Sequence, residues 1–533
     1  MEQKIPGKLG VWALMLVLGM MIGAAPAMAQ KAGGVLSATL RENPPSLSIH
    51  QESTISTVWP VMPIYNNLVI YDWKKAVEGP DTIVGELAES WSWDKTKTKL
   101  TFKLHKGVTW HDGKPFTSAD VKFTFDLVRG ASSVRMKTNP RDAYYANVKE
   151  IVTNGDHEVT FVLNRPQPGL LSIFATGYSP VTPAHIAPDD LRTTAVGTGP
   201  FKLQTFTPDQ SLVLEKNPNY FRKGRPYLDG INFVIIKARP SRTAALQAGQ
   251  VDIAFPTETN EAAYSTLKSA VPSMQFQKVA QAVGDNIIMN LKKAPFDNLK
   301  VRQAVSMAMD RSAMIKSVHQ GLAVPGGANV PPPYGVWGLS VKELASLPGY
   351  GDPEKNKAQA RKLLASLGYT KDKPLKVTVS TRAIAIYVDT ASWAIDQLKQ
   401  VGIEGTLEQI ETGNWHSKIT RGEYEMGINL TGVGPDDPDA NFYENYSCES
   451  PRNVTFYCNP EVEKLFEQQS METNPKKRLQ LVHDIDKRLQ MEVARPWMAH
   501  RLDYFAAHAY VKNLVAHHNA YNFGRMENVW LDK

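Results

Sequence analysis

The chain has 533 residues, of which 42% are hydrophobic and 21% charged, and its formal net charge is +7. These values are ordinary for a globular protein and exclude a disordered or fibrous chain. The positive charge is spread along the chain without a lysine- or arginine-rich block, so nucleic acid, which proteins bind through many phosphate contacts, is not an expected partner.

The first residues have the pattern of a secretory signal peptide. Lys4 and Lys8 precede an apolar run over residues 9–25, and Ala27 and Ala29 supply small residues at a cleavage position. The run is shorter than the roughly 20 residues that a transmembrane helix needs. We therefore expect cleavage after Ala29 and a mature protein that is free in the periplasm, with an uncleaved anchor as the alternative.

Mixed strands and helices are predicted after the signal. Cleavage would leave about 500 residues, which is too many for one hydrophobic core and indicates two or three lobes. The apolar alternation of residues 99–104 predicts a half-buried strand. Thr117 and Asp120 have the spacing of a capping box, and the helix that they begin is expected to end at Gly130. Residues 150–163 predict a hairpin that turns on an Asn-Gly pair.

Strands alternate with helices further along the chain. The pattern predicts strands over residues 231–238, 251–255, 375–382 and 424–430. One helix between them begins near Ser241, and another has Asp352 as its N-cap and Gly368 just past its end. This alternation implies parallel or mixed sheets covered by helices, and thus an α/β fold.

The two cysteines, Cys448 and Cys458, lie close together in the sequence. A signal peptide places them in an oxidising compartment, where a structural disulfide is expected. Redox-active pairs usually have two residues between their cysteines, which is fewer than here, and no further ligands with zinc spacing are nearby.

Two polar clusters lie at the carboxyl ends of predicted strands. Thr381 and Arg382 end one strand, and residues 431–439, TGVGPDDPD, follow another. In open α/β sheets, ligands bind at the carboxyl ends of the strands. We therefore expect both clusters to face one ligand crevice.

A longer segment carries a family resemblance. Residues 87–126, LAESWSWDKTKTKLTFKLHKGVTWHDGKPFTSADVKFTFD, closely resemble the signature of family 5 solute-binding proteins, the extracytoplasmic receptors of peptide and nickel ABC importers. The resemblance continues through VGTGPFKLQTF, ALQAGQVDIAF, NIIMNLKKAPFDNLKVRQAVSMAMDR and ARKLLASLGY. It extends over nearly all of the chain after the signal and is specific for the family, although not for one ligand.

The resemblance implies a two-lobed periplasmic-binding-protein fold of type II with a hinge and an additional, inserted α+β domain. The ligand is then enclosed between the lobes by hinge closure. The expected boundaries are 1–29 for the signal peptide, 30–61 with 197–284 and 503–533 for lobe 1, 62–196 for the inserted domain, and 285–502 for lobe 2.

The resemblance also suggests how a ligand is held. In dipeptide-binding relatives an arginine near the position of Arg382 holds the ligand's carboxylate, and an aspartate in the loop of Asp436 pairs with its α-amino group. Arg382 could instead be a surface arginine paired with a helix acid. The loop of Asp436 is one residue longer here, so Asp436 is either the amine anchor or a solvated residue. Asp437 before Pro438 is predicted to be a helix N-cap, and Asp439 to face the positive end of that helix.

Further candidates for the wall of the cleft are Glu52, Ser53 and Trp415. Glu52 and Ser53 occupy an early loop that lines the cleft in relatives, whereas Trp415 fits either a cleft or a core. His416 and His500 could be recruited by a metal, but lone histidines are more often solvated or structural.

The function implied is that of a receptor that captures a small ligand, first of all a peptide, and delivers it to the permease and ATPase subunits of an ABC importer. The receptor is expected to be a monomer without a cofactor. Opines, other carboxylated conjugates, oligosaccharides and metal chelates remain alternatives for the ligand. A periplasmic hydrolase is the distant alternative, because the chain has no G-x-S-x-G and no H-E-x-x-H motif.

Overall fold

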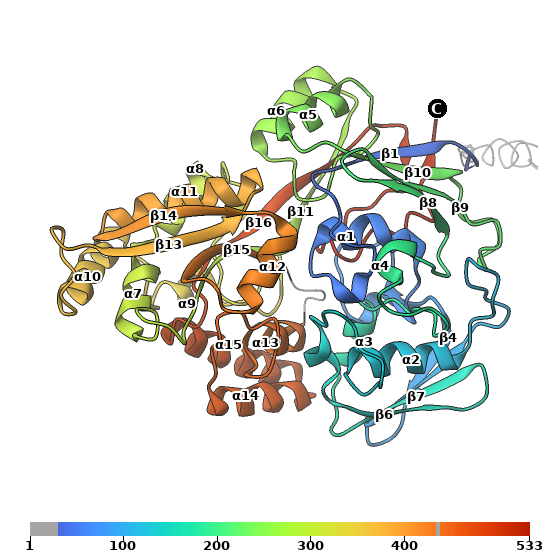
Figure 1. Ribbon diagram of the computed structural model, residues 1–533, viewed down its shortest axis with the longest axis horizontal. Coiled ribbons are helices and arrows are strands. Elements are labelled where there is room, and N and C mark those ends of the chain that lie inside the picture. The colour runs from blue at the N-terminus through green and yellow to red at the C-terminus, as the bar shows by residue number, and fades with distance from the viewer. Residues whose placement is uncertain (1–29, 433–436) are drawn as a thin grey trace, which may run out of the picture.

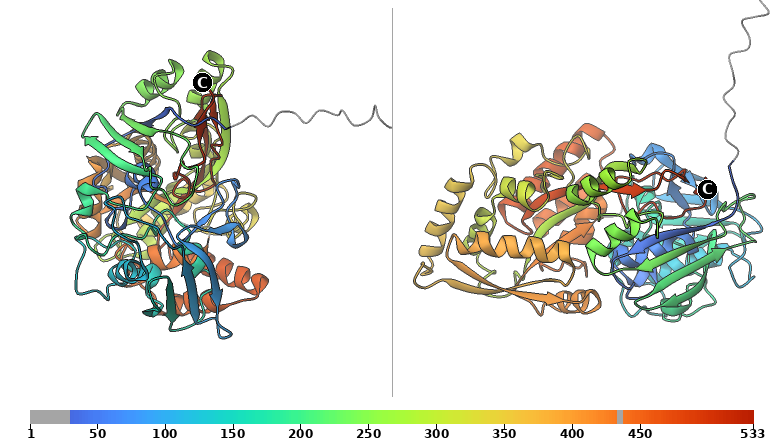
Figure 2. Two further views of the ribbon diagram at one scale, coloured as in Figure 1. Left: turned by 90° about the vertical axis from the view of Figure 1, so that its right-hand side faces the viewer. Right: turned by 90° about the horizontal axis from the view of Figure 1, so that it is seen from above.

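The computed structural model describes residues 30–432 and 437–533. The expected signal peptide and Asp436 lie outside these described residues. The molecule is elongated, with two parts side by side along its longest axis (Figure 1), and the view from above shows the same division (Figure 2). Among the described residues, no helix is long and apolar enough to cross a membrane.

The sheet that contains the N-terminal strand joins segments far apart in the sequence. Its order is β1-β10-β9-β8, with β1 parallel to β10 and the other neighbours antiparallel. The strands are β1 (Val35–Leu40), β8 (Phe201–Thr207), β9 (Ser211–Lys216) and β10 (Gly230–Ile235). Helix α1 (Ile55–Val61) carries the buried Trp59, whose ring packs edge-to-face on Phe233 with centroids 5.1 Å apart. This core anchors the segment before α1, which reaches the cavity described below.

A second, antiparallel sheet has the order β4-β5-β7-β6. It consists of β4 (Ala88–Trp93), β5 (Lys99–Leu104), β6 (Val148–Thr153) and β7 (Glu158–Leu163), with helix α2 (Ser118–Val128) packed on it. Phe102, Phe125, Phe161 and Phe174 form an aromatic core between sheet and helices. The predicted strand over residues 99–104, the hairpin and the capping box of α2 are all confirmed.

The third sheet has the order β12-β16-β11-β15-β13-β14. Its strands are β11 (Gln275–Met289), β12 (Ala323–Val324), β13 (Leu375–Arg382), β14 (Ile403–Ile410), β15 (Met426–Gly432) and β16 (Trp497–Ala507). β13 is parallel to both β14 and β15. β11 and β16 pair antiparallel, with a shift of register between Ala280 and Gly284, and both strands run from one part of the molecule towards the other (Figure 1).

Helices cover this third sheet and fill the rest of the part of the molecule that contains it (Figure 1). They include α7 (Leu299–Ala308), α8 (Arg311–Ser317), α9 (Val341–Leu344), α10 (Pro353–Ala365), α11 (Ala385–Lys399), α12 (Thr412–Thr420), α13 (Pro438–Tyr446), α14 (Pro460–Met471) and α15 (Pro475–Met491). The remaining elements are β2 (Val69–Tyr71), β3 (Ile83–Gly85), α3 (Leu170–Phe174), α4 (Leu191–Thr194), α5 (Arg239–Gln247), α6 (Glu261–Ala270), β17 (Val511–Lys512) and β18 (Trp530–Leu531).

The strands and helices predicted from residue 231 onwards are present, except for one strand. The strand predicted over residues 375–382 is β13, and Asp352 caps α10 by accepting a hydrogen bond from the backbone N–H of Lys355 at 2.9 Å. The strand predicted over residues 251–255 is wrong, because Ile253 makes only single bridges, to Ala38 and Ala507. The neighbouring Asp252 side chain instead accepts a hydrogen bond from a backbone N–H of β1, at 2.7 Å.

Cys448 and Cys458 form the expected disulfide. The bridge lies between α13 and α14, where it closes a short loop. Such a bridge restricts the unfolded chain and is expected to stabilise the protein by about 3 kcal/mol.

Candidate functional site

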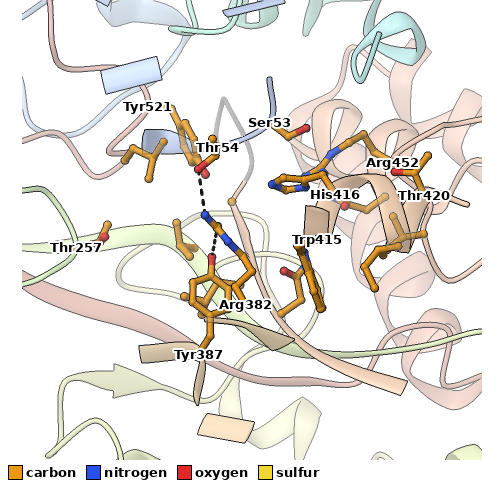
Figure 3. Close-up of a pocket in the computed structure, with 18 of the residues that line it drawn as sticks. Ser53, Thr54, Thr257, Arg382, Tyr387, Trp415, His416, Thr420, Arg452 and Tyr521 are labelled. Carbon is orange, nitrogen blue, oxygen red and sulfur yellow. Dashed lines mark hydrogen bonds between the residues drawn. The ribbon is translucent and has the colours of Figure 1, made fainter. Parts of the chain in front are cut away.

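The two parts of the molecule enclose a small cavity (Figure 3). Ser53 reaches it from the segment before α1, Arg382 from the end of β13, His416 from α12, and Tyr521 from the C-terminal segment. Gly432, the last residue of β15, also lines it, so the ends of β13 and β15 meet at one cavity. The volume is about 40 Å³, which leaves room for only a few water molecules and shows that the walls lie close together.

A wider cavity of about 540 Å³ adjoins the small one. The residues that line both are Ser53, Thr420, His416 and Arg452. Because the two cavities share these walls, we treat them as one cleft with a narrow inner end and a wide outer end.

Arg382 lies at the inner end and is fully engaged. Its Nη2 donates to Glu42 Oε1 at 2.8 Å, its Nη1 to the Tyr387 hydroxyl at 2.9 Å, and its Nε to Thr412 Oγ1 at 3.0 Å. The residue is 4% exposed. Arg382 is therefore not a surface arginine, and its carboxylate partner comes from the opposite part of the molecule rather than from a nearby helix.

Glu42 is the second residue after β1 and is held as an anion. Burial alone would raise the pKa of its carboxyl group, but the positive charges of Arg382 and Arg41 more than offset this and lower the pKa. Ser56 and Thr412 also donate to it. Glu42 thus links β1 to the ends of β13 and α12 across the cleft.

Arg41 belongs to a second buried charge cluster at the same end. It pairs with Glu258 at 3.2 Å, and Arg242 pairs with the same carboxylate at 2.6 Å. Burial opposes ionisation of Glu258, yet Arg242 and Arg41 lower its pKa to about 2. This carboxylate therefore stays charged at neutral pH.

The other predicted wall residues also lie at the cleft. Trp415 is 2% exposed, lines the inner end, and packs in a core cluster with Ile288 and Ile419, so both alternatives hold for it. Ser53 lines both ends, and Glu52 lines the outer end. Glu52 accepts a hydrogen bond from Ser46 at 2.7 Å, and burial raises the pKa of its carboxyl group.

The aspartates near the start of α13 have structural partners. Asp437 is the N-cap, as predicted, and accepts a hydrogen bond from the backbone N–H of Asp439 at 3.0 Å. It also pairs with Arg478 at 2.8 Å, and the fully buried Asp439 accepts from Ser470 at 2.8 Å. Facing a helix end is therefore only part of the role of Asp439. The prediction for Asp436 as an amine anchor falls outside the described residues.

His416 and His500, the two histidines considered for a metal, both have a pKa that is lowered by burial. His500 is hydrogen-bonded to the backbone carbonyl of Gly327 at 2.9 Å, and burial lowers its pKa to about 4. Burial, together with the charge of Arg382, also lowers the pKa of His416, so its ring is neutral at pH 7. In the described part of the chain, no group of three or more His, Cys, Asp or Glu side chains could hold a metal ion.

Several residues of the cleft were missed in the sequence. They are Arg41, Glu42, Arg452, Arg495 and Tyr521. For Arg41 and Glu42 a signal existed, since a charged pair directly after a buried strand is the same pattern that singled out Arg382. Arg495 and Tyr521 stand alone among ordinary neighbours and gave no such signal.

Comparisons with known proteins agree with the resemblance. The probable di/tripeptide-binding protein 5 of Pseudomonas aeruginosa (strain UCBPP-PA14) is 26% identical over 545 residues, covering 97% of this chain and 98% of its own. The dipeptide-binding protein of Escherichia coli (strain K12) is 27% identical, covering 79% of this chain and 80% of its own.

Solved structures show the same fold. The periplasmic binding protein DppA of Helicobacter pylori, in complex with the peptide STSA, superposes with a TM-score of 0.82 at 22% identity and covers 94% of this chain and 99% of its own. The binding protein AgaA of A. tumefacien R10, in complex with agropinic acid, superposes with a TM-score of 0.80 at 22% identity, with the same coverage. The expected α/β fold, that of the type II periplasmic binding proteins, is confirmed.

The family itself is shown by the sequence match. Residues 82–453 match the bacterial extracellular solute-binding proteins, family 5 Middle, and this segment is more than half of the chain. Proteins of this family are receptors of transport systems rather than enzymes. The chain belongs to the bacterial extracellular solute-binding proteins of family 5.

Proposed function

We propose that the chain is the extracytoplasmic receptor of an ABC importer and that it captures a small peptide between its lobes. Relatives named as di- and tripeptide-binding proteins, and a neighbour solved with a bound peptide, support this ligand class. The observation that carries the proposal is the buried cavity whose walls come from both parts and contain guanidinium groups. Every free peptide ends in a carboxylate, which a guanidinium binds through parallel hydrogen bonds.

Arg382 is the proposed partner of that carboxylate. Glu42 now takes the guanidinium's Nη2 at 2.8 Å, so a ligand carboxylate has to replace Glu42 there. The two residues lie on opposite sides of the cleft, and opening the lobes would separate them and free Arg382. Ser53, Trp415 and Glu52 are proposed to form walls around the rest of the ligand.

The proposed hinge is the crossing of β11 and β16. We place lobe 1 over residues 30–61, 197–284 and 503–533, the inserted domain over 62–196, and lobe 2 over 285–502. With these boundaries, lobe 1 passes into lobe 2 inside β11 and returns inside β16. The shift of register between Ala280 and Gly284 supports this position, because an irregular point in a paired strand can bend.

Membership of the family supports a proposal for the transport partners. The receptor would deliver its ligand to separate permease and ATPase subunits, act as a monomer, and reach the periplasm through cleavage after Ala29. The periplasmic location is supported by relatives, among them a neighbour described as a periplasmic binding protein.

A carboxylated conjugate such as an opine is the second candidate ligand. The arginine-lined cavity suits any small molecule with a carboxylate, and AgaA, solved with agropinic acid, has the same fold. Acid hydrolysis of the bound ligand distinguishes the two classes, because a peptide yields ordinary amino acids only.

The test is capture from a defined mixture. The mature protein is unfolded, washed free of ligand, refolded and incubated with a library of di- to pentapeptides, and the bound fraction is released and sequenced by mass spectrometry. We expect retention of peptides at one per chain. Retention of none, together with retention of opine-type conjugates in a parallel incubation, would replace the peptide by the second candidate.

A further inference from the structure

The inner end of the cleft has an excess of positive charge. The charged residues that line it in the described part of the chain are all arginines: Arg41, Arg382, Arg452, Arg495 and Arg501. Neighbouring carboxylates neutralise three of them, through pairs with Glu258, Glu42 and Glu444 at 2.8 to 3.2 Å. Among the described residues, no carboxylate lies this close to Arg495 or Arg501.

Arg495 is the least compensated of these cations. It is 2% exposed, and its Nη1 donates to the neutral Asn445 Oδ1 at 2.8 Å and to Thr431 Oγ1 at 3.2 Å. Its buried Nε has no hydrogen-bond partner, and no carboxylate lies within 4 Å of the guanidinium among the described residues. Burial lowers the pKa of this group, as expected for a charge that has lost water without gaining a counter-ion.

Arg501 is only weakly compensated. It approaches Asp503 at 3.7 Å, which is too long for a hydrogen bond, and its Nε and Nη1 have no hydrogen-bond partners within residues 30–432 and 437–533. Two buried guanidinium groups at one cavity therefore have donors to spare. Unsatisfied buried donors are rare in proteins, and a bound anion would satisfy them.

The outer end of the cleft is also basic. Its charged lining consists of Lys137, Arg192, Arg421, Arg452 and one acid, Glu52. Arg192 pairs with Glu52 at 3.4 Å, and Arg421 pairs with Glu423 at 2.7 Å. The exposed Lys137 has no ion pair in the described residues, so its ammonium group is available to a ligand.

A neutral ring joins the two ends. His416 lines both, and its buried Nε2 has no hydrogen-bond partner in the described chain. Figure 3 shows His416 beside Arg452 and Ser53. His416 therefore lies on the wall shared by the inner end, which Arg495 lines, and the outer end, which Lys137 lines.

We propose that this receptor selects acidic ligands: small peptides whose terminal carboxylate binds Arg382 and which carry at least one Asp or Glu side chain, with side-chain carboxylates beside Arg495 or beside Lys137 and Arg452. This inference rests on the proposed function and specifies its substrate class. A neutral peptide would leave a buried guanidinium unpaired, and a lysine-containing peptide would add a like charge, so both bind less well than an acidic peptide.

The peptide library described above tests the inference. Acidic peptides should be enriched in the bound fraction by about 10-fold or more over matched peptides with Gln, and further over those with Lys. Retention of neutral or basic peptides at equal frequency would overturn the charge preference while leaving the peptide receptor intact. Retention of no peptide at all would instead overturn the proposed function and the inference with it.

Two substitutions locate the preference. Arg495→Gln removes the buried cation, and Lys137→Gln removes an exposed cation whose loss cannot disturb the core. We expect Lys137→Gln to reduce the enrichment of acidic peptides about 3-fold and Arg495→Gln to reduce it more, with Lys355→Gln on the distant α10 as the matched control. Circular dichroism checks the folding of the Arg495 variant. Unchanged enrichment in folded Arg495→Gln and in Lys137→Gln would overturn the proposed positions of the side-chain carboxylates.

Discussion

Replacing Arg382 with alanine should lower both ligand affinity and stability, for two separate reasons. The guanidinium holds Glu42 at 2.8 Å, and the two side chains are only 5% and 16% exposed. Removing Arg382 leaves the buried Glu42 with only the more distant Arg41, at 3.7 Å, as a counter-ion, which we expect to cost about 3 kcal/mol of unfolding free energy. Losing the partner of the ligand's carboxylate should cost a further 2 to 5 kcal/mol in binding, or roughly 30-fold to several-thousand-fold in affinity.

A double variant separates the two effects. Adding Glu42→Gln to Arg382→Ala removes the orphaned charge, so most of the lost stability should return while affinity stays low. Thermal unfolding measures the first quantity, and titration calorimetry with one retained peptide measures the second, with Lys355→Gln as the control. If Arg382→Ala binds that peptide as tightly as the parent protein, Arg382 does not hold its carboxylate and the reasoning fails.

The other predictions concern stability, redox state and conformation. Free-thiol titration of the unfolded, unreduced protein should find no thiols, and two reactive thiols would contradict the bridge between Cys448 and Cys458. Asp437→Ala loses both a helix cap and the 2.8 Å pair with Arg478, so urea unfolding should show a loss of about 3 kcal/mol rather than the roughly 1 kcal/mol of a cap alone, and Asp437→Asn, which keeps the cap, should lose less. Glu258 has a folded pKa of about 2, below its value in the unfolded chain, so its contribution to stability is present above pH 4.5 and is lost as the pH falls towards 2. Glu258→Gln should therefore flatten the stability curve over that range, and an unchanged slope would contradict the pairing. Small-angle scattering should show a more compact molecule when the ligand-free protein takes up a retained peptide, and no change at saturation would argue against hinge closure.

Local features were readable in the sequence wherever neighbouring residues determine them. The capping box of Thr117 and Asp120, the N-cap at Asp352 and the strand over residues 375–382 need only the periodicity and end signals of one segment. The strand over 251–255 failed because its pairing depends on β1 and β16, which leave Ile253 with single bridges only. The strand propensity of a segment does not include its pairing with distant strands, so it cannot predict this result.

The candidate site was predictable on one side only. Arg382 could be singled out because it ends a strand and because the family resemblance suggested an arginine near this position, but its partner Glu42 is 340 residues away in the chain. The pair of Asp437 with Arg478 was also missed because its partners are distant in the chain. From the sequence alone, Asp437 is predicted only to cap a helix. The uncompensated charge of Arg495 emerges only when burial and every neighbouring carboxylate are known.

Titration calorimetry of the refolded, ligand-free protein with a peptide that it has retained tests the central claim most directly. The account predicts saturable binding of one peptide per chain at micromolar affinity or better, with the peptide recovered intact afterwards. A titration without saturable heat for any retained peptide, or recovery of the peptide as cleaved products, would contradict the assignment of this chain as a peptide receptor.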